Sequence, residues 1–416
     1  MTMVRTFDPI DISSLGFWAQ PAAVRDEAFA VLRRERPVSF HQPITFGIAG
    51  LTPTEDAGYW ALATHELVRQ ASRDAETFTS SRGVTMEEVP QEVSEEIASF
   101  LVMDGVRHNT LRRLVSSAFT PRNVARIEAQ IARQAEAIVD QLLDTGDCDF
   151  VETVSMRLPM WTISEMIGVP EHEREPLARW ANTMVGANDP EFAREGSGLA
   201  MLFAAQRQIF QAATALADER RSDPRDDLMT ALVQAEVEGH RLSDQEIGAL
   251  MVLLVVAGND TTRQTTSHGM KALCDHPNQR SLLREDVAGR IEATVEELLR
   301  WATPVMQFRR TATTDVELHG EQILAGEKVV LLYTSANRDG TVFSDPWAFD
   351  ISRSPNDHLG FGGGGPHHCL GANLVRTQLR CLFSELITRV PGLDVGEPEY
   401  LTANFMHGIK RMPCTH

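Results

Sequence analysis

The feature that constrains the fold most is a long apolar pattern of helical period that starts at Ser243 and runs to about Ala272. Ser243 with Glu246 three residues later forms a capping-box pattern, which is typical of a helix start. A helix of this extent is about 45 Å long at 1.5 Å per residue. It is long enough to cross the whole molecule, and its apolar stretch from Ala249 to Gly258 predicts that it is buried.

The middle of this predicted helix has an unusual composition, "AGNDTT", from Ala257 to Thr262. A glycine, an acid and two threonines are poor choices inside an apolar helix, because Thr261 can bond back to the Ala257 carbonyl and distort the turn. Such local strain indicates a functional site. The alternative is that Asp260 pairs with Arg263 at i,i+3 on a wet face while the threonines only pack.

The rest of the chain predicts a mainly α-helical fold with small β-sheets. Helical periodicity dominates residues 125–300, and no internal repeat or long linker divides the 416 residues. We therefore expect one domain spanning residues 1–416. Short β-like stretches occur at 37–40, 58–63, 315–320 and 328–333.

Charge and composition exclude several partners. The net charge of −19 disfavours nucleic acid and anionic membranes, since both select basic surfaces. No window reaches the 18 apolar residues of a membrane span, and the N-terminus lacks a secretory signal pattern, so we predict a cytoplasmic protein. The five cysteines are odd in number and scattered, which favours reduced thiols over a disulfide framework.

One cysteine has a distinctive setting, "FGGGGPHHCLG", residues 361–371. Leucines at helical spacing follow it, which places Cys369 at or just before a helix N-terminus, where free N–H groups favour a thiolate. The glycines let the backbone pass close to a flat or bulky group. Three interpretations remain open: a nucleophile, although His367 and His368 are too close in sequence to be obvious bases; a zinc site with His358, which lacks the usual spacing; and an axial ligand of haem iron.

A further helical pair lies in "EELLR", where Glu297 and Arg300 share one face of a helix that must end before Pro304. Taken alone, such a pair is most simply a surface ion pair. The order and separation of "AGNDTT", Glu297-x-x-Arg300 and the glycine-rich cysteine segment nevertheless resemble the cytochromes P450, the haem-thiolate monooxygenases, over nearly the whole chain. The resemblance implies the P450 fold, with haem b (iron protoporphyrin IX) between the long central helix and the helix that follows Cys369.

The resemblance also assigns roles to individual residues. It implies that Cys369 is the proximal metal ligand, that Asp260 and Thr261 are the acid and alcohol of oxygen activation, and that Glu297, Arg300 and Arg353 hold the cysteine loop. The remaining implied cofactor contacts are His108, Arg112, Arg310 (or Arg309) and His367 at the propionates, with Ala257, Gly258, Phe361, Gly362 and Gly371 along the macrocycle. This chain departs from the family pattern at four positions. Gly105 and Val106 stand in place of prolines, and Gly362 and His368 each stand in place of an aromatic residue.

A narrower resemblance links the segments 14–40, 254–263, 358–374 and 405–410 to mycobacterial hydroxylases of methyl-branched lipids. It implies an apolar substrate, a methyl-branched lipid or isoprenoid, hydroxylated at or near its terminal carbon. The predicted pocket residues are Met86, Phe100, Leu101, Met184, Val256, Val305, Met306, Phe405 and Met406. We interpret the glutamates between 87 and 96 as a solvated lid surface.

Electrons must come from other proteins, because the chain has neither a dinucleotide fingerprint nor ferredoxin-like cysteine spacing. We expect NAD(P)H to supply them through a ferredoxin reductase and a ferredoxin, with dioxygen as co-substrate. Arg113, Arg376 and Arg380 are the predicted docking cations. Two alternatives stay open: a P450 that acts on a steroid, terpenoid or aromatic metabolite, and a non-catalytic haem sensor or carrier, against which Asp260 and Thr261 weigh.

Overall fold

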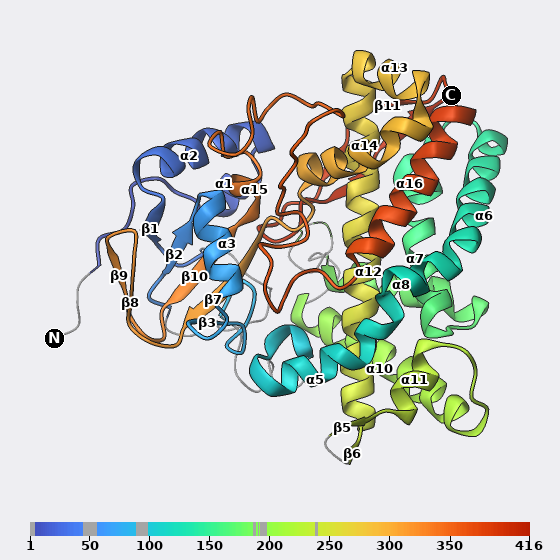
Figure 1. Ribbon diagram of the computed structural model, residues 1–416, viewed down its shortest axis with the longest axis horizontal. Helices are drawn as coiled ribbons and strands as arrows, with labels where there is room; N and C mark the ends of the chain where they lie inside the picture. The colour runs from blue at the N-terminus through green and yellow to red at the C-terminus, as the bar shows by residue number, and fades with distance from the viewer. Residues whose placement is uncertain are drawn as a thin grey trace.

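The computed structural model describes residues 5–44, 56–88, 99–185, 189, 191, 198–237 and 240–416. Figure 1 shows a smaller part built around a sheet and a larger part built of long helices, with the central helix standing at the boundary of the helical part. The helices are α1 Leu15–Trp18, α2 Ala22–Glu35, α3 His65–Arg73, α5 Gly105–Ser116, α6 Pro121–Thr145, α7 Arg157–Ile167, α8 Glu171–Val185, α10 Gly198–Ser222, α11 Leu228–Gln234, α12 Asp244–Asp275, α13 Pro277–Glu285, α14 Val287–Ala302, α15 Tyr333–Ala336 and α16 Ala372–Arg389.

The strands are short, and most of them pair locally. The main sheet has the order β1-β2-β10-β7-β3, with β10 parallel to β2 and the other pairs antiparallel. The strands are β1 Val38–His41, β2 Tyr59–Leu62, β3 Phe78–Thr79, β4 Cys148–Asp149, β5 Glu236–Val237, β6 His240–Arg241, β7 Gln307–Ala312, β8 Val316–Leu318, β9 Glu321–Ile323, β10 Lys328–Leu332, β11 Asp394–Val395, β12 Glu399–Tyr400, β13 Ile409–Arg411 and β14 Pro413–Thr415. The four β-like stretches of the sequence are confirmed as β1, β2, β8 and β10.

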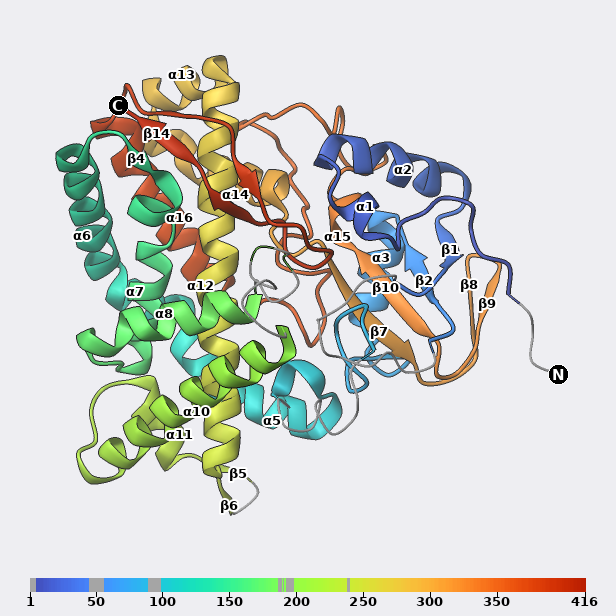
Figure 2. The ribbon, with the colours of Figure 1, turned by 180° about the vertical axis from the view of Figure 1, so that it is seen from behind.

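The predicted central helix is confirmed as α12, which at 32 residues is about 48 Å long. Its capping box is formed: the Ser243 hydroxyl oxygen accepts from the Glu246 amide at 3.2 Å, and a Glu246 carboxylate oxygen accepts from the Ser243 amide at 2.9 Å. α7, α8, α10 and α14 pack around it, as the two opposite views show (Figure 2). The fold is mainly α with small sheets, as the sequence predicts.

Two helix boundaries position the site. α14 ends at Ala302, and Thr303 adopts a left-handed conformation with φ 39°, so the chain turns out of the helix directly before Pro304. α16 begins at Ala372 with Gly371 as its N-cap, two residues after Cys369. Within the described part of the chain, no helix is long and apolar enough to cross a membrane.

Candidate active site

A cavity lies between the middle of α12 and the segment that carries Cys369. About 1300 Å³ of space, part of it open to solvent, is free of protein atoms there. α12 contributes successive turns to one wall, namely Leu253, Leu254, Ala257, Gly258, Thr261 and Thr265. The opposite wall includes Phe361, Gly362, Cys369 and Gly371, and Cys369 is the one sulfur-bearing side chain among the described lining residues.

The cysteine segment is closed by its own backbone. The Cys369 amide donates to the Phe361 carbonyl at 2.9 Å, and the Gly362 amide donates to the Leu359 carbonyl at 2.9 Å. Gly362 has φ 93° and lines the cavity, so it holds a backbone conformation that L side chains rarely adopt. The loop therefore presents Cys369 to the cavity directly before α16.

The other glycines of the run meet α3 instead of the cavity. A Cβ at Gly363 would lie 2.5 Å from the Ser72 hydroxyl, and a Cβ at Gly365 would lie 2.5 Å from the Ser72 carbonyl. At Gly364 it would meet the Arg73 guanidinium at 3.0 Å. The close backbone approach that the glycines predict is therefore made by Gly363, Gly364 and Gly365 to α3, whereas Gly362 and Gly371, the two glycines assigned to the cofactor site, line the cavity.

The ionisation of Cys369 also differs from the expectation. Burial raises the pKa of its thiol above the ordinary value, and the Gly371 amide and the charges of Arg112 and Arg376 oppose that rise without overcoming it. The helix end alone therefore does not favour the thiolate here. A metal ion bound to the sulfur would supply the missing stabilisation, since a coordinating thiol is deprotonated outright.

Arg112, His367 and His368 line the same cavity, and His108 lies against His367. His108 and His367 lie with their ring centroids 4.4 Å apart, and Arg112 donates to the His368 carbonyl. Within the described chain, the buried Nε2 atom of His108 has no hydrogen-bond partner. Such an orphaned polar atom calls for a ligand group that the protein itself does not provide.

The two arginines of β7 that are candidates for the propionate contact have different surroundings. Arg309 pairs with Glu88 at 3.1 Å and donates to the Glu87 carbonyl at 3.3 Å. Arg310, on the opposite face of the strand, is buried and forms no ion pair with any described carboxylate. Burial lowers the pKa of Arg310, although nearby Tyr333 and Asp104 oppose this shift.

These observations fit a haem bound in the cavity. Cys369 faces the space as a soft ligand, and a Cβ added at Gly371 would meet no atom within 4 Å. His108 Nε2 has no hydrogen-bond partner among the described residues, and the buried Arg310 has no described carboxylate as counter-ion. An anionic propionate would satisfy both basic groups. The zinc alternative fails, because His358 pairs with Glu296 and no group of three potential ligands that could hold a metal occurs among the described residues.

Asp104 belongs to this site, although sequence reasoning assigned no role to it. Its carboxylate accepts from His367 Nε2 at 2.8 Å, the Thr79 hydroxyl at 2.5 Å and the Ser80 amide at 2.6 Å. Burial alone would raise the pKa of Asp104, but these hydrogen bonds outweigh it and hold the pKa below its usual value. Asp104 thereby fixes the orientation of His367, and its position before the helix of His108 was the signal available in the sequence.

The Asp260–Thr261 pair divides between two faces of α12. Thr261 lines the cavity, and its hydroxyl donates to the Ala257 carbonyl at 2.9 Å, as the composition predicts, while α12 stays α-helical through this turn. Asp260 is buried outside the cavity lining and forms an ion pair with Arg263. Arg263 in turn donates to the Asn182 side chain at 3.0 Å. The predicted i,i+3 pair exists, but on a buried face rather than a wet one.

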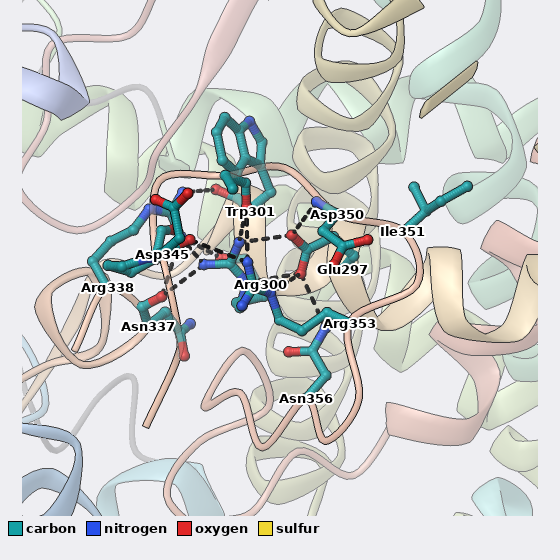
Figure 3. Close-up of polar contacts among 12 residues, drawn as sticks. Glu297, Arg300, Trp301, Asn337, Arg338, Asp345, Asp350, Ile351, Arg353 and Asn356 are labelled. Atoms are coloured by element: carbon teal, nitrogen blue, oxygen red, sulfur yellow. Dashed lines mark hydrogen bonds and ion pairs between the residues drawn. The ribbon is translucent and has the colours of Figure 1, made fainter. Parts of the chain in front are cut away.

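Glu297 and Arg300 form the centre of a fully buried network (Figure 3). Two Arg300 nitrogens donate to Glu297 at 2.7 Å, and Arg353 forms a second ion pair with Glu297 at 3.3 Å. Arg300 also donates to the carbonyls of Asn337, Pro346 and Ala348, and Glu297 accepts from Asn356 and from the Asp350 amide. The network ties α14 to the chain that leads into the cysteine loop, so it is no surface pair.

The predicted pocket residues are only partly in the cavity. Phe100, Leu101 and Val305 line it. Met86 and Met306 are core residues beside α1 and α2, Met406 is buried and forms a β-bridge with Val305, and Phe405 packs edge-to-face on Phe308, 5.3 Å away, behind the wall. Met184 and Val256 pack against the main core. Sequence reasoning missed the lining residues Leu253, Leu254, Ile163, Phe119, Phe308 and Tyr333. The two leucines lie seven and eight residues before Thr261, which is two helical turns back on the same face, so helical spacing from Thr261 would have found them.

The two described glutamates of the predicted acidic lid, Glu87 and Glu88, do not form a solvated surface. Glu87 is buried and accepts from Asn404 at 3.1 Å, and Glu88 forms ion pairs with Arg309 and Lys328. The later glutamates, up to 96, lie outside the described residues.

A cysteine that faces a threonine of the central helix across a cavity, with basic groups beside it, defines the site of a haem-thiolate oxygenase. The family model "Cytochrome P450" matches residues 197–390. The chain is 43% identical over 410 residues to the methyl-branched lipid omega-hydroxylase of Mycobacterium tuberculosis, covering 98% of this chain and 94% of that protein. The protein therefore belongs to the cytochrome P450 family and is a P450 monooxygenase.

Two further relatives refine this placement. The steroid C26-monooxygenase of Mycolicibacterium smegmatis is 39% identical over 390 residues, which is 92% of this chain and 88% of that protein. The structure of Mycobacterium marinum cytochrome P450 CYP268A2 in complex with pseudoionone superimposes with a TM-score of 0.97 at 51% identity, covering 100% of both chains. The two curated relatives are named as a hydroxylase and a monooxygenase, so the interpretation as a non-catalytic sensor or carrier is set aside.

The contrast between the β7 arginines gives a first prediction. Arg310→Met should weaken haem retention, because it removes the buried cation that has no counter-ion among the described carboxylates, while Arg309→Met should leave haem retention unchanged. The measurement is the rate of haem transfer from each purified holoprotein to an acceptor apoprotein. Faster loss from Arg309→Met than from Arg310→Met would contradict the assignment.

Proposed function

We propose that this P450 binds haem b with Cys369 as the axial ligand and hydroxylates an apolar, methyl-branched lipid or isoprenoid at or near its terminal carbon. The observation that carries the proposal is a single cavity whose walls bring together Cys369, Thr261 and a mainly aliphatic and aromatic lining. We propose that residues 1–416 act as one catalytic domain.

The bound haem would supply reductive activation of dioxygen, with thiolate donation favouring O–O cleavage. His108, Arg112, Arg310 and His367 would hold its propionates, and the Glu297–Arg300–Arg353 network would keep the cysteine loop in place. Thr261 would move a proton within the cavity when its hydroxyl leaves the Ala257 carbonyl. Asp260 would act indirectly, by holding the helical turn that carries Thr261, since its carboxylate pairs with Arg263 outside the cavity lining.

The substrate class rests on the lining and on the relatives. Leu253, Leu254, Ile163, Phe119 and Phe308 give the wall near Thr261 an apolar character suited to a hydrocarbon chain. The relative at 43% identity is named for methyl-branched lipids, and the solved relative at 51% identity holds pseudoionone, a branched acyclic isoprenoid. Attack at a terminal methyl has to overcome its stronger C–H bond, so the walls must hold the chain end at the reactive centre.

A steroid is the second candidate, because a steroid C26-monooxygenase is 39% identical over 92% of the chain. The test is a substrate-binding titration of the holoenzyme with a methyl-branched acid, the linear acid of equal chain length, pseudoionone and a sterol, followed by product analysis with a surrogate ferredoxin and reductase. We expect the branched chains to bind at least about fivefold more tightly than the linear chain, since each added carbon placed in an apolar pocket is worth on the order of 1 kcal/mol. Response to the sterol alone would reject the branched-chain proposal.

Thr261 gives a second prediction. Thr261→Ala should retain haem and substrate binding but release more reducing equivalents as hydrogen peroxide, because the hydroxyl that moves the proton is lost. Thr265→Ala, one turn along the same wall, is the matched control and should stay coupled. The ratio of product formed to NAD(P)H consumed measures this, and an unchanged ratio in Thr261→Ala would sink the role.

We propose a ferredoxin as the electron donor, docking on the cysteine side. Of the predicted cations, Arg376 is paired with Glu296 at 2.6 Å and Arg380 with Glu128 at 2.5 Å, whereas Arg113 on α5 is exposed. Arg113→Glu should therefore slow ferredoxin-driven turnover, most strongly at low salt, and leave peroxide-driven turnover unchanged. Equal loss in both assays would indicate damage to the site instead of lost docking.

A further inference from the structure

Two cysteines far apart in the sequence face each other near the C-terminus. β4 and β14 pair antiparallel with Cys148 directly opposite Cys414, and the two Sγ atoms are 3.2 Å apart. Figure 2 shows these strands side by side, on the side of the helical part away from the sheet. Directly opposite residues of an antiparallel pair have Cα separations of about 4.5–5.5 Å, within the range that a disulfide bridges.

The other three cysteines are placed differently, and all five lie in the described chain. Cys274 contacts the Leu393 carbonyl and Arg280, Cys381 packs on the core from α16, and Cys369 faces the cavity. No second sulfur contacts any of them. Cys148 is half-buried and Cys414 is buried, so one sulfur of the facing pair is near the surface and the other is behind it.

We propose that Cys148 and Cys414 form a redox-active pair that a peroxide converts into a disulfide across β4 and β14. Peroxide is the reduced oxygen species that an oxygenase releases when turnover fails to yield product, so the established activity supplies the oxidant. The pair lies outside the substrate site, so added peroxide can test it without the substrate and without the electron donor that we propose above.

The chemistry balances with one peroxide and two thiols. The Cys148 sulfur attacks the O–O bond of hydrogen peroxide, which forms an S–O bond and releases water once the leaving hydroxide takes up the thiol proton. The Cys414 sulfur then displaces the sulfenic oxygen, which forms the S–S bond and releases a second water. Two electrons pass from the thiols to the peroxide, and a dithiol reductant reverses the step.

The surroundings of the two sulfurs determine which of them reacts with peroxide first. Burial and the adjacent Cys148 raise the pKa of the Cys414 thiol to about 12, so Cys414 stays protonated at neutral pH. The first attack on peroxide therefore falls to the more accessible Cys148. Cys414 is already in contact and resolves the intermediate without movement of the strands.

The cross-link would tie down a segment that supports the cavity. The strand before β14, β13, follows a turn in which Met406 bridges Val305 and the His407 amide donates to the Pro304 carbonyl at 2.8 Å. Linking residues 266 apart removes much of the freedom of the unfolded chain. We therefore expect the oxidised protein to unfold at a higher temperature than the reduced protein.

The test treats the reduced holoenzyme with one equivalent of hydrogen peroxide, then denatures it, alkylates the free thiols and maps the peptides. We expect a peptide pair joined through Cys148 and Cys414, with a mass two hydrogens lower than the sum of the two reduced peptides. The thermal midpoint of the oxidised protein should be several degrees higher, and a dithiol should return it to the value of the reduced protein. Cys381→Ser, the half-buried control, should behave like the wild type, whereas Cys148→Ala and Cys414→Ala should form no cross-link and show no rise. Two alkylated thiols at these positions after treatment, a sulfinic acid at Cys148, or an equal rise in Cys148→Ala would overturn the proposal.

Discussion

Replacing Cys369 by serine is expected to abolish the red-shifted absorption band of the ferrous–CO complex. An alcohol at this position lacks the soft, readily ionised sulfur that donates to iron. No other described residue of the cavity lining can take over, because Cys369 is the one that carries sulfur. Hydroxylation should fall to the background of the assay even if some haem stays bound.

Cys381→Ser is the matched control for this variant. Cys381 lies on α16, the helix that follows the cysteine loop, and it packs against the core without reaching the cavity. The control should keep the band and the turnover of the wild type. Loss of the band in Cys381→Ser with its survival in Cys369→Ser would overturn the assignment of the ligand.

Glu297→Gln is expected to destabilise the fold by about 3–5 kcal/mol, the usual cost of leaving a buried charge without its partner. The carboxylate of Glu297 is fully buried and compensates two guanidinium groups, those of Arg300 and Arg353 (Figure 3). An amide keeps the shape but removes the charge, so both cations lose their counter-ion. We expect a large loss of holoprotein yield and a strongly lowered midpoint in urea.

The neighbouring Glu296→Gln offers the same chemical change on the same helix. Glu296 binds His358 and Arg376, but its side chain is 28% exposed and water can replace part of the lost interaction. Its variant should lose about 1 kcal/mol or less, as partly exposed ion pairs do. Equal destabilisation by the two substitutions would show that the buried network around Glu297 contributes no more to the free energy of unfolding than the partly exposed pairs of Glu296.

The sequence predicted the elements whose signals are local. The capping box of Ser243 and the apolar period that follows it define α12, and the leucines after Cys369 define α16, because period and capping act within a few residues. The Thr261 bond to the Ala257 carbonyl is of the same local kind. These features were therefore available before any tertiary contact was known.

The features that failed depend on contacts between distant segments. The glycine run could not reveal that Ser72 and Arg73 of α3 would be its neighbours. The methionines chosen for the pocket have the same composition signal as core residues, and Met86 and Met306 prove to be core. Whether Arg309 or Arg310 faces the site follows from the register of β7, which the sequence alone did not set.

The most direct test of the whole account is turnover of the wild-type holoenzyme with a methyl-branched chain under isotopically labelled dioxygen. The measurement is the mass and position of the oxygen in the product. The account predicts one labelled oxygen atom per product molecule, in an alcohol at or near the terminal carbon, formed with NAD(P)H, a ferredoxin and its reductase. Unlabelled alcohol, or no hydroxylated product from an enzyme that shows the ferrous–CO band and binds the chain, would contradict it.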